Sequence, residues 1–265
     1  MNKRLLAILI SVAVLSVVLI LSFTLFTVRD VKVEFQGTVT KITADEIITA
    51  AGIKKNKSIF AFSENEVGNL IQEKIPTVKV VNIERRFPDT VVIHAAERYG
   101  LLIVPVTDGK TVTAYALTDR ELSVMDIIPK EAYETALKDG VYKNIAKSRI
   151  TANADNVKPG RVLNPDSDVQ IRILANIVIA YERLGLVNSA FTAFVSEIEY
   201  VSGGVLITTV PGVKIEIANA ADAEQMIKKS YDWYLDTSTA PEANRVLSGI
   251  IIYDETAHAY KWYDK

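Results

Sequence analysis

The side chains best suited to catalysis are few and scattered along this chain. Its two histidines, His94 and His258, lie far apart in the sequence, and neither has the neighbours of a metal-binding motif. Ser230 lies on an expected helix without a motif that would supply a general base. The glycine pair at 203–204 precedes an expected strand, whereas a phosphate-binding loop precedes a helix. We therefore expect no enzyme activity, no cofactor and no metal site.

Composition narrows the possible functions further. The chain of 265 residues contains no cysteine, which excludes disulfides, thiolate metal sites and thiol nucleophiles. Its formal net charge is −2, of which Lys3 and Arg4 contribute +2, so the remainder carries −4. Such a chain lacks the basic footprint of a nucleic-acid-binding protein, and we expect no nucleic-acid partner. A chain without cysteine tolerates an oxidising exterior, and we expect it in a bacterial cell envelope.

Recognition of a partner is the chemistry that the C-terminal residues favour. Residues 248–254 and 257–263 alternate as two strands around a turn at 255–256. A strand at a sheet edge presents unpaired amides and carbonyls to a partner strand, and aromatic residues are enriched at interface cores. Two interpretations remain open, docking of a partner and capping of the domain core, and alternate residues could serve each. The candidate partner-binding residues are Tyr253, Ala259, Tyr260, Lys261 and Trp262.

An unbroken uncharged run occupies residues 5–28, directly after Lys3 and Arg4. About 20 apolar residues suffice to cross a bilayer as a helix. A cleaved signal peptide is the competing interpretation, but its apolar core is shorter, and it ends in a small-residue cleavage site that this run lacks. We therefore expect a retained transmembrane helix at 5–28. The positive-inside rule places the tail at 1–4 in the cytoplasm and the remaining chain outside it.

Residues 29–98 are typical of a strand, two helices and two strands. Residues 30–35 alternate polar and apolar side chains, which is the period of a half-buried strand. The segments at 43–46 and 63–66 both fit the capping box, in which two side chains bind each other's backbone amides at a helix start. The last two strands flank Pro88-Asp89, which suits the central positions of a type I turn.

Three segments of this unit carry a resemblance to a known family. They read VRDVKVEFQG at 28–37, AGIKKNKSIF at 51–60 and IPTVKVVNIERRFPDTVVI at 75–93, closed by AER at 96–98. In that order, behind an apolar run, they resemble the POTRA domain of the FtsQ/DivIB family of bacterial cell-division proteins. The sequence departs from the family in having Asn56-Lys57 where a glycine is usual.

Residues 99–265 predict a second unit that mixes strands and helices. Its order of a Glu-Ile-x-Tyr strand, a Pro-Gly-Val strand, an amphipathic helix and a strand ending in Tyr-Asp is similar to the C-terminal β domain of the same family. Between about 119 and 165 the sequence predicts no strand. The strands expected elsewhere lie at 101–106, 112–117, 195–200, 205–209 and 213–217, and the helices lie at 129–140, after Pro165 and near 222–235.

Together these patterns predict an α+β protein. It comprises a single N-terminal transmembrane helix, a POTRA-like β-α-α-β-β domain at 29–98, and a mixed or antiparallel β domain with packed helices at 99–265. The resemblance implies a bitopic scaffold enriched at the division septum. It also implies partners, namely FtsB/DivIC-like and FtsL-like coiled-coil proteins and, through them, the septal wall synthase. In the family, strand addition occurs at the end of the β domain, which corresponds to residues 257–263 here.

Two further questions stay open at the level of sequence. Arg85 and Arg86 belong either to a solvated sheet face, with Glu97 and Arg98 in cross-strand ion pairs, or to a docking patch. The other function considered is a single-anchor extracytoplasmic sensor or ligand-binding domain. The four-residue tail at 1–4 is too short to carry a signalling module, which argues against the sensor.

Overall fold

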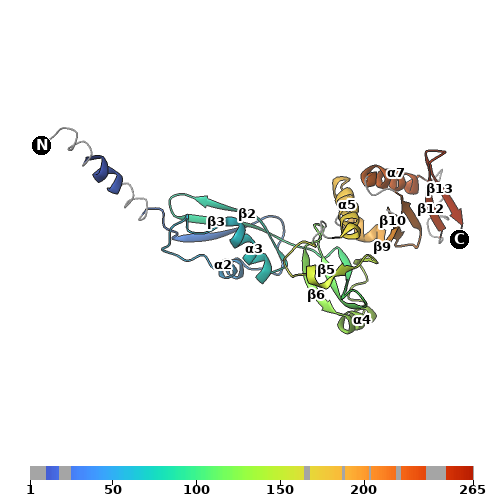
Figure 1. The fold of residues 1–265 in the computed structure, drawn as a ribbon, viewed down its shortest axis with the longest axis horizontal. Helices are drawn as coiled ribbons and strands as arrows, with labels where there is room; N and C mark the ends of the chain where they lie inside the picture. Colours follow the sequence, from blue (N-terminus) through green and yellow to red (C-terminus); the bar gives the residue numbers. More distant parts are fainter. Residues whose placement is uncertain are drawn as a thin grey trace. The chain divides into compact units, whose positions relative to one another are not determined.

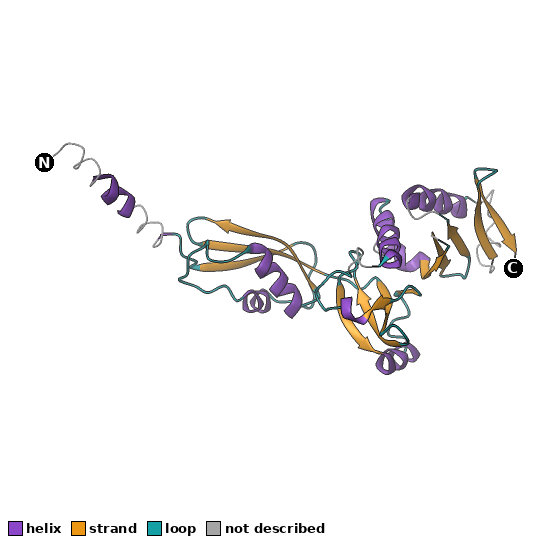
Figure 2. Ribbon diagram, in the orientation of Figure 1, coloured by secondary structure: helices purple, strands orange, loops and turns teal. Residues whose placement is uncertain are grey.

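The computed structural model describes residues 10–17, 25–163, 168–186, 189–202, 204–218, 222–236 and 249–264. The chain divides into two compact units, Met1–Arg98 and Tyr99–Lys265. Each unit has its own hydrophobic core, and the helices and strands of both are drawn in Figures 1 and 2.

The expected transmembrane helix at 5–28 falls only partly within the described residues, and 10–17 is its described helical part. In the part of the chain that the structure describes, no helix combines the length and apolar character needed to span a bilayer. Val28, the last residue of the expected span, is fully buried in the core of the first unit. The Val28 N–H donates to the carbonyl of Lys57 over 2.8 Å, which makes residue 28 part of the folded unit.

The first unit is a three-stranded sheet with two helices. The central strand β3 (Thr90–Glu97) is parallel to β1 (Asp30–Phe35) and antiparallel to β2 (Val78–Arg86). The helices α2 (Ala44–Ala51) and α3 (Glu64–Lys74) lie on one side of the sheet (Figure 2), as the expected β-α-α-β-β order allows. The core between the helices and the sheet includes Val31, Ile47, Ile71, Ile83 and Ile93.

Local signals in the sequence explain where the two helices begin. The Thr43 side chain accepts from the Glu46 N–H, and the Glu46 carboxylate accepts from the Thr43 N–H over 2.8 Å, so α2 has the complete capping box. At α3 only half of the expected box forms, since Ser63 Oγ accepts from the Glu66 N–H at 3.4 Å without the reciprocal bond.

Two turns of the first unit differ from simple expectation. Asn56, which stands where the family usually has glycine, adopts a left-handed φ of 61°. Asparagine tolerates that region better than most residues, so it can stand where a glycine is usual. The turn between β2 and β3 lies at Pro88 as expected, but the Phe87–Pro88 peptide bond is cis, which the expected type I turn did not include.

The second unit is built on one sheet in the strand order β13-β12-β11-β10-β9-β7-β4-β5-β6, with β8 beside β4. The expected antiparallel meander is present as β9, β10 and β11. Short strands β7 and β8 and the hairpin strand β6 occupy the stretch in which the sequence predicted none. The bounds are β4 (Leu102–Thr107), β5 (Val112–Thr118), β6 (Val124–Pro129), β7 (Ala146–Ser148), β8 (Ala152–Asn153), β9 (Val195–Val201), β10 (Gly204–Thr209), β11 (Lys214–Ile217), β12 (Gly249–Asp254) and β13 (Ala259–Asp264).

The helices of the second unit cover this sheet and connect its strands. β11 and β12 are parallel, so the chain between them must cross over, and α7 (Ala223–Leu235) lies in that connection. It packs against α5 (Val169–Arg183) over a core that includes Ile177, Ile215 and Ile251. The remaining helices are α4 (Lys130–Lys138), α6 (Ser189–Phe194) and the short 3₁₀ turn η1 (Ala154–Asn156).

Candidate partner-binding surfaces

The last strand, β13, lies at one edge of the long sheet. It pairs antiparallel with β12 in a continuous register, from Ala259 opposite Asp254 to Asp264 opposite Gly249. Among the described residues no strand pairs with its other side, and Figure 1 shows β13 at the end of the sheet. Alternate residues of an edge strand direct their N–H and C=O groups away from the sheet. β13 can therefore serve as a template for another strand.

The two faces of β13 have different environments. Tyr260 is only 5% exposed, and its hydroxyl donates to the carbonyl of Met226 in α7 over 3.1 Å. Its ring contacts that of Tyr253 at a centroid distance of 5.2 Å, and burial raises the pKa of the Tyr260 phenol. Trp262 is half-buried against the same core. Tyr260 is therefore a core residue, and its side chain is not available as an anchor for a partner.

The opposite face of β13 presents exposed side chains. Lys261 is exposed, and Tyr263, which we did not single out from the sequence, is 47% exposed. Ile252 and Ile250 of β12 lie directly across from them in the register and are only partly buried. The sequence signal for Tyr263 is the alternation of the strand, which places Lys261 and Tyr263 on the same face and Trp262 on the other. This face offers an apolar strip beside the free edge.

The turn between β12 and β13 is fixed by Asp254. Its carboxylate accepts the backbone N–H groups of Thr256 and Ala257 at 2.9 and 3.0 Å, and it pairs with Lys261. The hydrogen bond from Lys261 holds the pKa of the Asp254 carboxyl below its usual range. His258 lies exposed in this turn with a φ of 49°. The hairpin is thus ordered by its own side chains.

Arg85, a predicted docking residue, is held within the first unit. Its Nε donates to the carbonyl of Ile59 over 2.9 Å and its Nη2 to that of Phe62 over 2.8 Å. Its Nη1 pairs with Glu64, and the guanidinium lies 4.8 Å from the Phe62 ring centroid. These contacts fasten the segment at 59–64, which leads into α3, to strand β2. The side chain of Arg85 therefore serves the fold.

Arg86 points to the other face of the same strand and belongs to an exposed charge network. It pairs with Glu34 of β1 at 2.7 Å and with Glu84 at 3.0 Å. His94 of β3 lies between the same carboxylates, 3.5 and 3.3 Å from them. The hydrogen bonds from Arg86 hold the pKa of both carboxyls below their usual range. Arg86 thus has the cross-strand ion pairs expected of a solvated face. The face is not solvated throughout, because Val92, which lies opposite Glu84 in the register, is fully buried.

Glu97 and Arg98 make hydrogen bonds within the first unit. Arg98 is buried, with its Nε donating to the carbonyl of Val78 over 3.0 Å and its Nη2 to Gln72 Oε1 over 2.6 Å. The Glu97 carboxylate accepts the backbone N–H of Thr40 over 2.6 Å. Arg98 thus ties the end of β3 to α3 and to the start of β2, and Glu97 ties it to the loop before α2.

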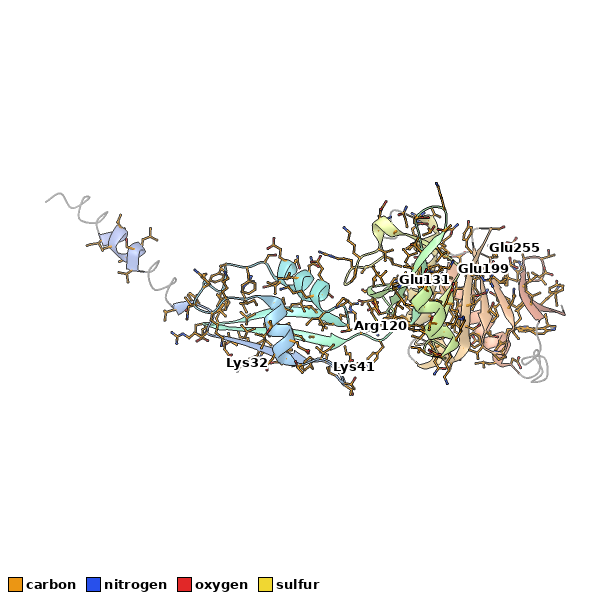
Figure 3. The ribbon with its side chains drawn as sticks, turned by 90° about the horizontal axis from the view of Figure 1, so that it is seen from below. Lys32, Lys41, Arg120, Glu131, Glu199 and Glu255 are labelled. Carbon is orange, nitrogen blue, oxygen red and sulfur yellow. The ribbon has the colours of Figure 1, made fainter. Side chains whose placement is uncertain are left out.

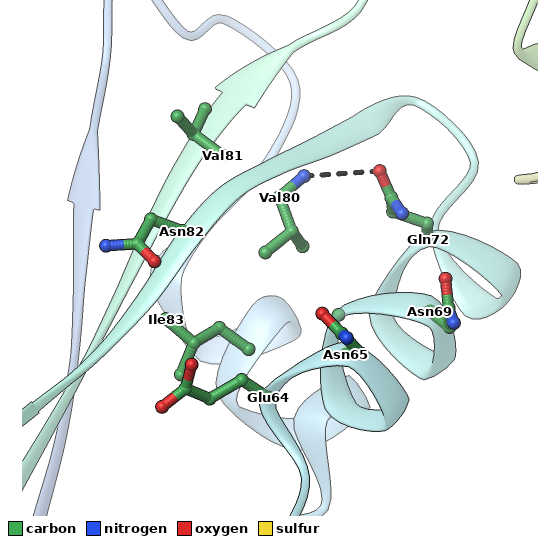
Figure 4. Close-up of a pocket in the computed structure, with 9 residues that line it drawn as sticks. Glu64, Asn65, Asn69, Gln72, Val80, Val81, Asn82 and Ile83 are labelled. Carbon is green, nitrogen blue, oxygen red and sulfur yellow. Dashed lines mark hydrogen bonds between the residues drawn. The ribbon is translucent and has the colours of Figure 1, made fainter.

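A groove of about 350 Å³ lies between α3 and the outer strand β2 (Figure 4). Gln72 from the helix accepts the backbone N–H of Val80 at 3.4 Å, and a β-bulge between Val80 and Asn82 interrupts the strand. Bulges and capped amides are devices that protect a sheet edge from pairing. The edge at β2 is therefore less suited to strand addition than β13.

The far edge of the long sheet, β6, is covered at its start. The Val124 N–H donates to the carbonyl of Arg161 over 2.9 Å, and the Val124 carbonyl accepts from the Gly160 N–H over 2.8 Å. Pro129, which lacks an N–H, ends the strand. These features leave β13 as the better template for a partner strand.

The side chains considered for catalysis have structural partners. Ser230 is buried, and its hydroxyl donates to the carbonyl of Ile227 in the same helix over 2.9 Å. His94 lies in the charge network and His258 in the turn described above. Within the described ranges no group of three histidine, aspartate or glutamate side chains is placed to hold a metal ion.

Comparison with known proteins bears on the first unit. Residues 27–98 match the family model described as "POTRA domain, FtsQ-type". The chain is also similar to "Cell division protein FtsQ" of Corynebacterium glutamicum, with 30% identity over 112 residues. That match covers 41% of this chain and 49% of the relative, so the chain spans about half the length of the curated relative it matches.

Proposed function

We propose that the chain is a non-catalytic scaffold of the bacterial division machinery. The support is a first unit that matches the FtsQ-type POTRA model, together with a sequence identity that supports membership of the FtsQ/DivIB family. The observation that carries the proposal is the strand edge at β13, whose outer side pairs with no described strand. Its partners would be an FtsB/DivIC-like and an FtsL-like coiled-coil protein. Through them the chain would help to couple division to the septal wall synthase.

The scaffold would hold its partner by strand addition. The partner strand would bind the outward N–H and C=O groups of β13, and these main-chain bonds supply affinity without a specific side-chain sequence. Alternate partner side chains would then pack on the face that carries Tyr263, Ile250 and Ile252, where partly exposed apolar area is available. Specificity would come from that face, because backbone bonds alone do not discriminate between sequences.

We propose that the apolar run anchors this scaffold in the cell membrane, with the N-terminus in the cytoplasm and both units outside it. The support is the length of the uncharged run and the basic residues Lys3 and Arg4 before it. An anchor confines β13 to the layer in which membrane-bound partners lie. This raises the effective concentration of the partners at β13.

A matched pair of variants tests the docking face. The full chain is co-purified with the FtsL-like and DivIC/FtsB-like proteins of the same bacterium, and the affinity is measured for Tyr263→Ala and for Tyr99→Ala. Tyr99 is 61% exposed at the start of the same unit and provides the same substitution away from β13. We expect Tyr263→Ala to weaken binding by about 1–3 kcal/mol, the range of an interface anchor, and Tyr99→Ala to change it little. Equal affinities for both variants, or no enrichment of the chain at midcell, would contradict the proposal.

Cross-linking tests strand addition itself. Because the natural chain has no cysteine, Tyr263→Cys introduces its only thiol. Successive cysteines along the partner segment should cross-link to it at every second position, which is the period of a strand. A period of three to four positions would show a docked helix instead, and strand addition would be rejected while a scaffold role remained open.

A further inference from the structure

Exposed phenylalanines gather at one end of the first unit. Phe60 is 60% exposed and Phe87 is 58% exposed. With Phe26 they form a three-ring cluster, with centroids 5.6 Å apart for Phe26–Phe87 and for Phe60–Phe87 and 6.1 Å apart for Phe26–Phe60. A single exposed apolar side chain is ordinary, but contiguous ones mark an interaction site. We call these three residues the phenylalanine patch.

Backbone hydrogen bonds place this patch where the N-terminal apolar run meets the folded unit. The Ile59 N–H donates to the carbonyl of Phe26 over 2.9 Å, and the Arg29 N–H donates to the carbonyl of Asp89 over 2.8 Å. These bonds bring the loop before α3 and the tip of the β2–β3 hairpin beside residues 26–29, at the end of the apolar run. The patch therefore begins where the apolar run ends.

Basic side chains lie on the chain segments that form the phenylalanine patch. Lys54, Lys55 and Lys57 are exposed in the loop that binds Val28, and the Arg29 side chain is 67% exposed. Asp89, 3.8 Å from Arg29, and Asp30, 3.5 Å from Lys32, lie on the same segments. Among these named residues basic charge exceeds acidic charge.

We propose that this end of the first unit docks on the surface of a lipid bilayer, with Phe60 and Phe87 in the interfacial layer and the lysines against anionic headgroups. The inference rests on the proposed function, because it takes the apolar run as the membrane anchor. Apolar and aromatic side chains flanked by lysine and arginine are the composition of interfacial membrane contacts. Basic residues within a Debye length of an anionic leaflet are attracted to it. The anchor holds the patch next to the bilayer, so a contact too weak to recruit a free protein suffices here. Docking would fix the tilt of the unit against the membrane.

A polarity-sensitive fluorophore can test this on the full chain, since each introduced cysteine is the only thiol. The probe is placed by Lys55→Cys, which leaves all three phenylalanines intact. Lys41→Cys is the control, because Lys41 is exposed and lies at the opposite end of the unit (Figure 3). Its neighbour Thr40 is bound to Glu97, at the end of β3 far from the hairpin tip. Both chains are reconstituted in phosphatidylcholine vesicles with or without phosphatidylglycerol and separated by flotation.

We expect the probe at position 55 to shift its emission to the blue and to be quenched by spin-labelled lipid, and the probe at 41 to do neither. Phosphatidylglycerol should strengthen the quenching, added salt should weaken it, and the Phe60→Ser, Phe87→Ser double variant should abolish it. A chain that does not float with vesicles would refute the proposed anchor. A chain that floats while both probes respond alike would refute lipid docking alone. Shielding at 55 that requires a co-reconstituted division protein would also overturn lipid docking and assign the patch to a protein.

Discussion

Replacing Tyr260 with alanine should destabilise the second unit strongly, although an edge-strand tyrosine is commonly a surface residue. Tyr260 is only 5% exposed in the native unit, and its hydroxyl donates to the carbonyl of Met226. Truncating a buried aromatic side chain to alanine costs about 3–5 kcal/mol. Tyr260→Phe isolates the hydroxyl, and a hydrogen bond of this kind contributes about 1 kcal/mol. Tyr263→Ala on the opposite face should change the free energy of unfolding by less than about 0.5 kcal/mol, as surface substitutions do.

Urea unfolding of residues 99–265, followed by circular dichroism, measures these differences. With a slope of about 2 kcal/mol per molar urea, a loss of 3–5 kcal/mol lowers the midpoint by roughly 2 M. The phenylalanine variant should lower it by about a quarter of that amount. If Tyr260→Ala and Tyr263→Ala unfold at the same midpoint, the placement of Tyr260 in the core is wrong, and the assignment of the two faces of β13 fails with it.

Three further predictions concern other contacts. Arg85→Ala removes the bonds that fasten the segment before α3 and should lower the unfolding free energy of the first unit by about 2–4 kcal/mol. Arg86→Ala on the solvated face should lower it far less, and equal melting temperatures of the two variants would contradict the distinction. Gly249→Ala places a Cβ against the ring of Trp262 and should cost about 1–3 kcal/mol with a shift in tryptophan emission, and unchanged emission would show that the ring does not lie there. Burial raises the pKa of Tyr133 from 10 to about 12, so the folded state holds this proton more tightly. The resulting stability is complete below pH 10 and is lost as pH rises toward 12, by at most about 3 kcal/mol. Urea midpoints measured across that interval should show this pH dependence in the unaltered chain and lose it in Tyr133→Phe.

The elements that the sequence determined by itself are those specified by neighbouring residues. The alternation at 30–35 predicted β1, the capping pair Thr43 and Glu46 predicted the start of α2, and the paired runs before and after residue 255 predicted the β12–β13 hairpin. Each of these signals comes from side-chain period or from a bond between residues close in the chain. The order of the elements in the first unit followed for the same reason.

Contacts between distant segments determine what those elements face. Alternation places Arg85 and Arg86 on opposite sides of one strand, but which side the helices cover depends on packing between distant segments. The short strands β7 and β8 exist because β4 and β9 offer pairing partners far away in the chain, and two or three residues carry no detectable period. The core place of Tyr260 and the meeting of Phe26, Phe60 and Phe87 likewise depend on contacts across the chain. Burial is a property of the assembled fold, and the period of a strand states only which residues share a face.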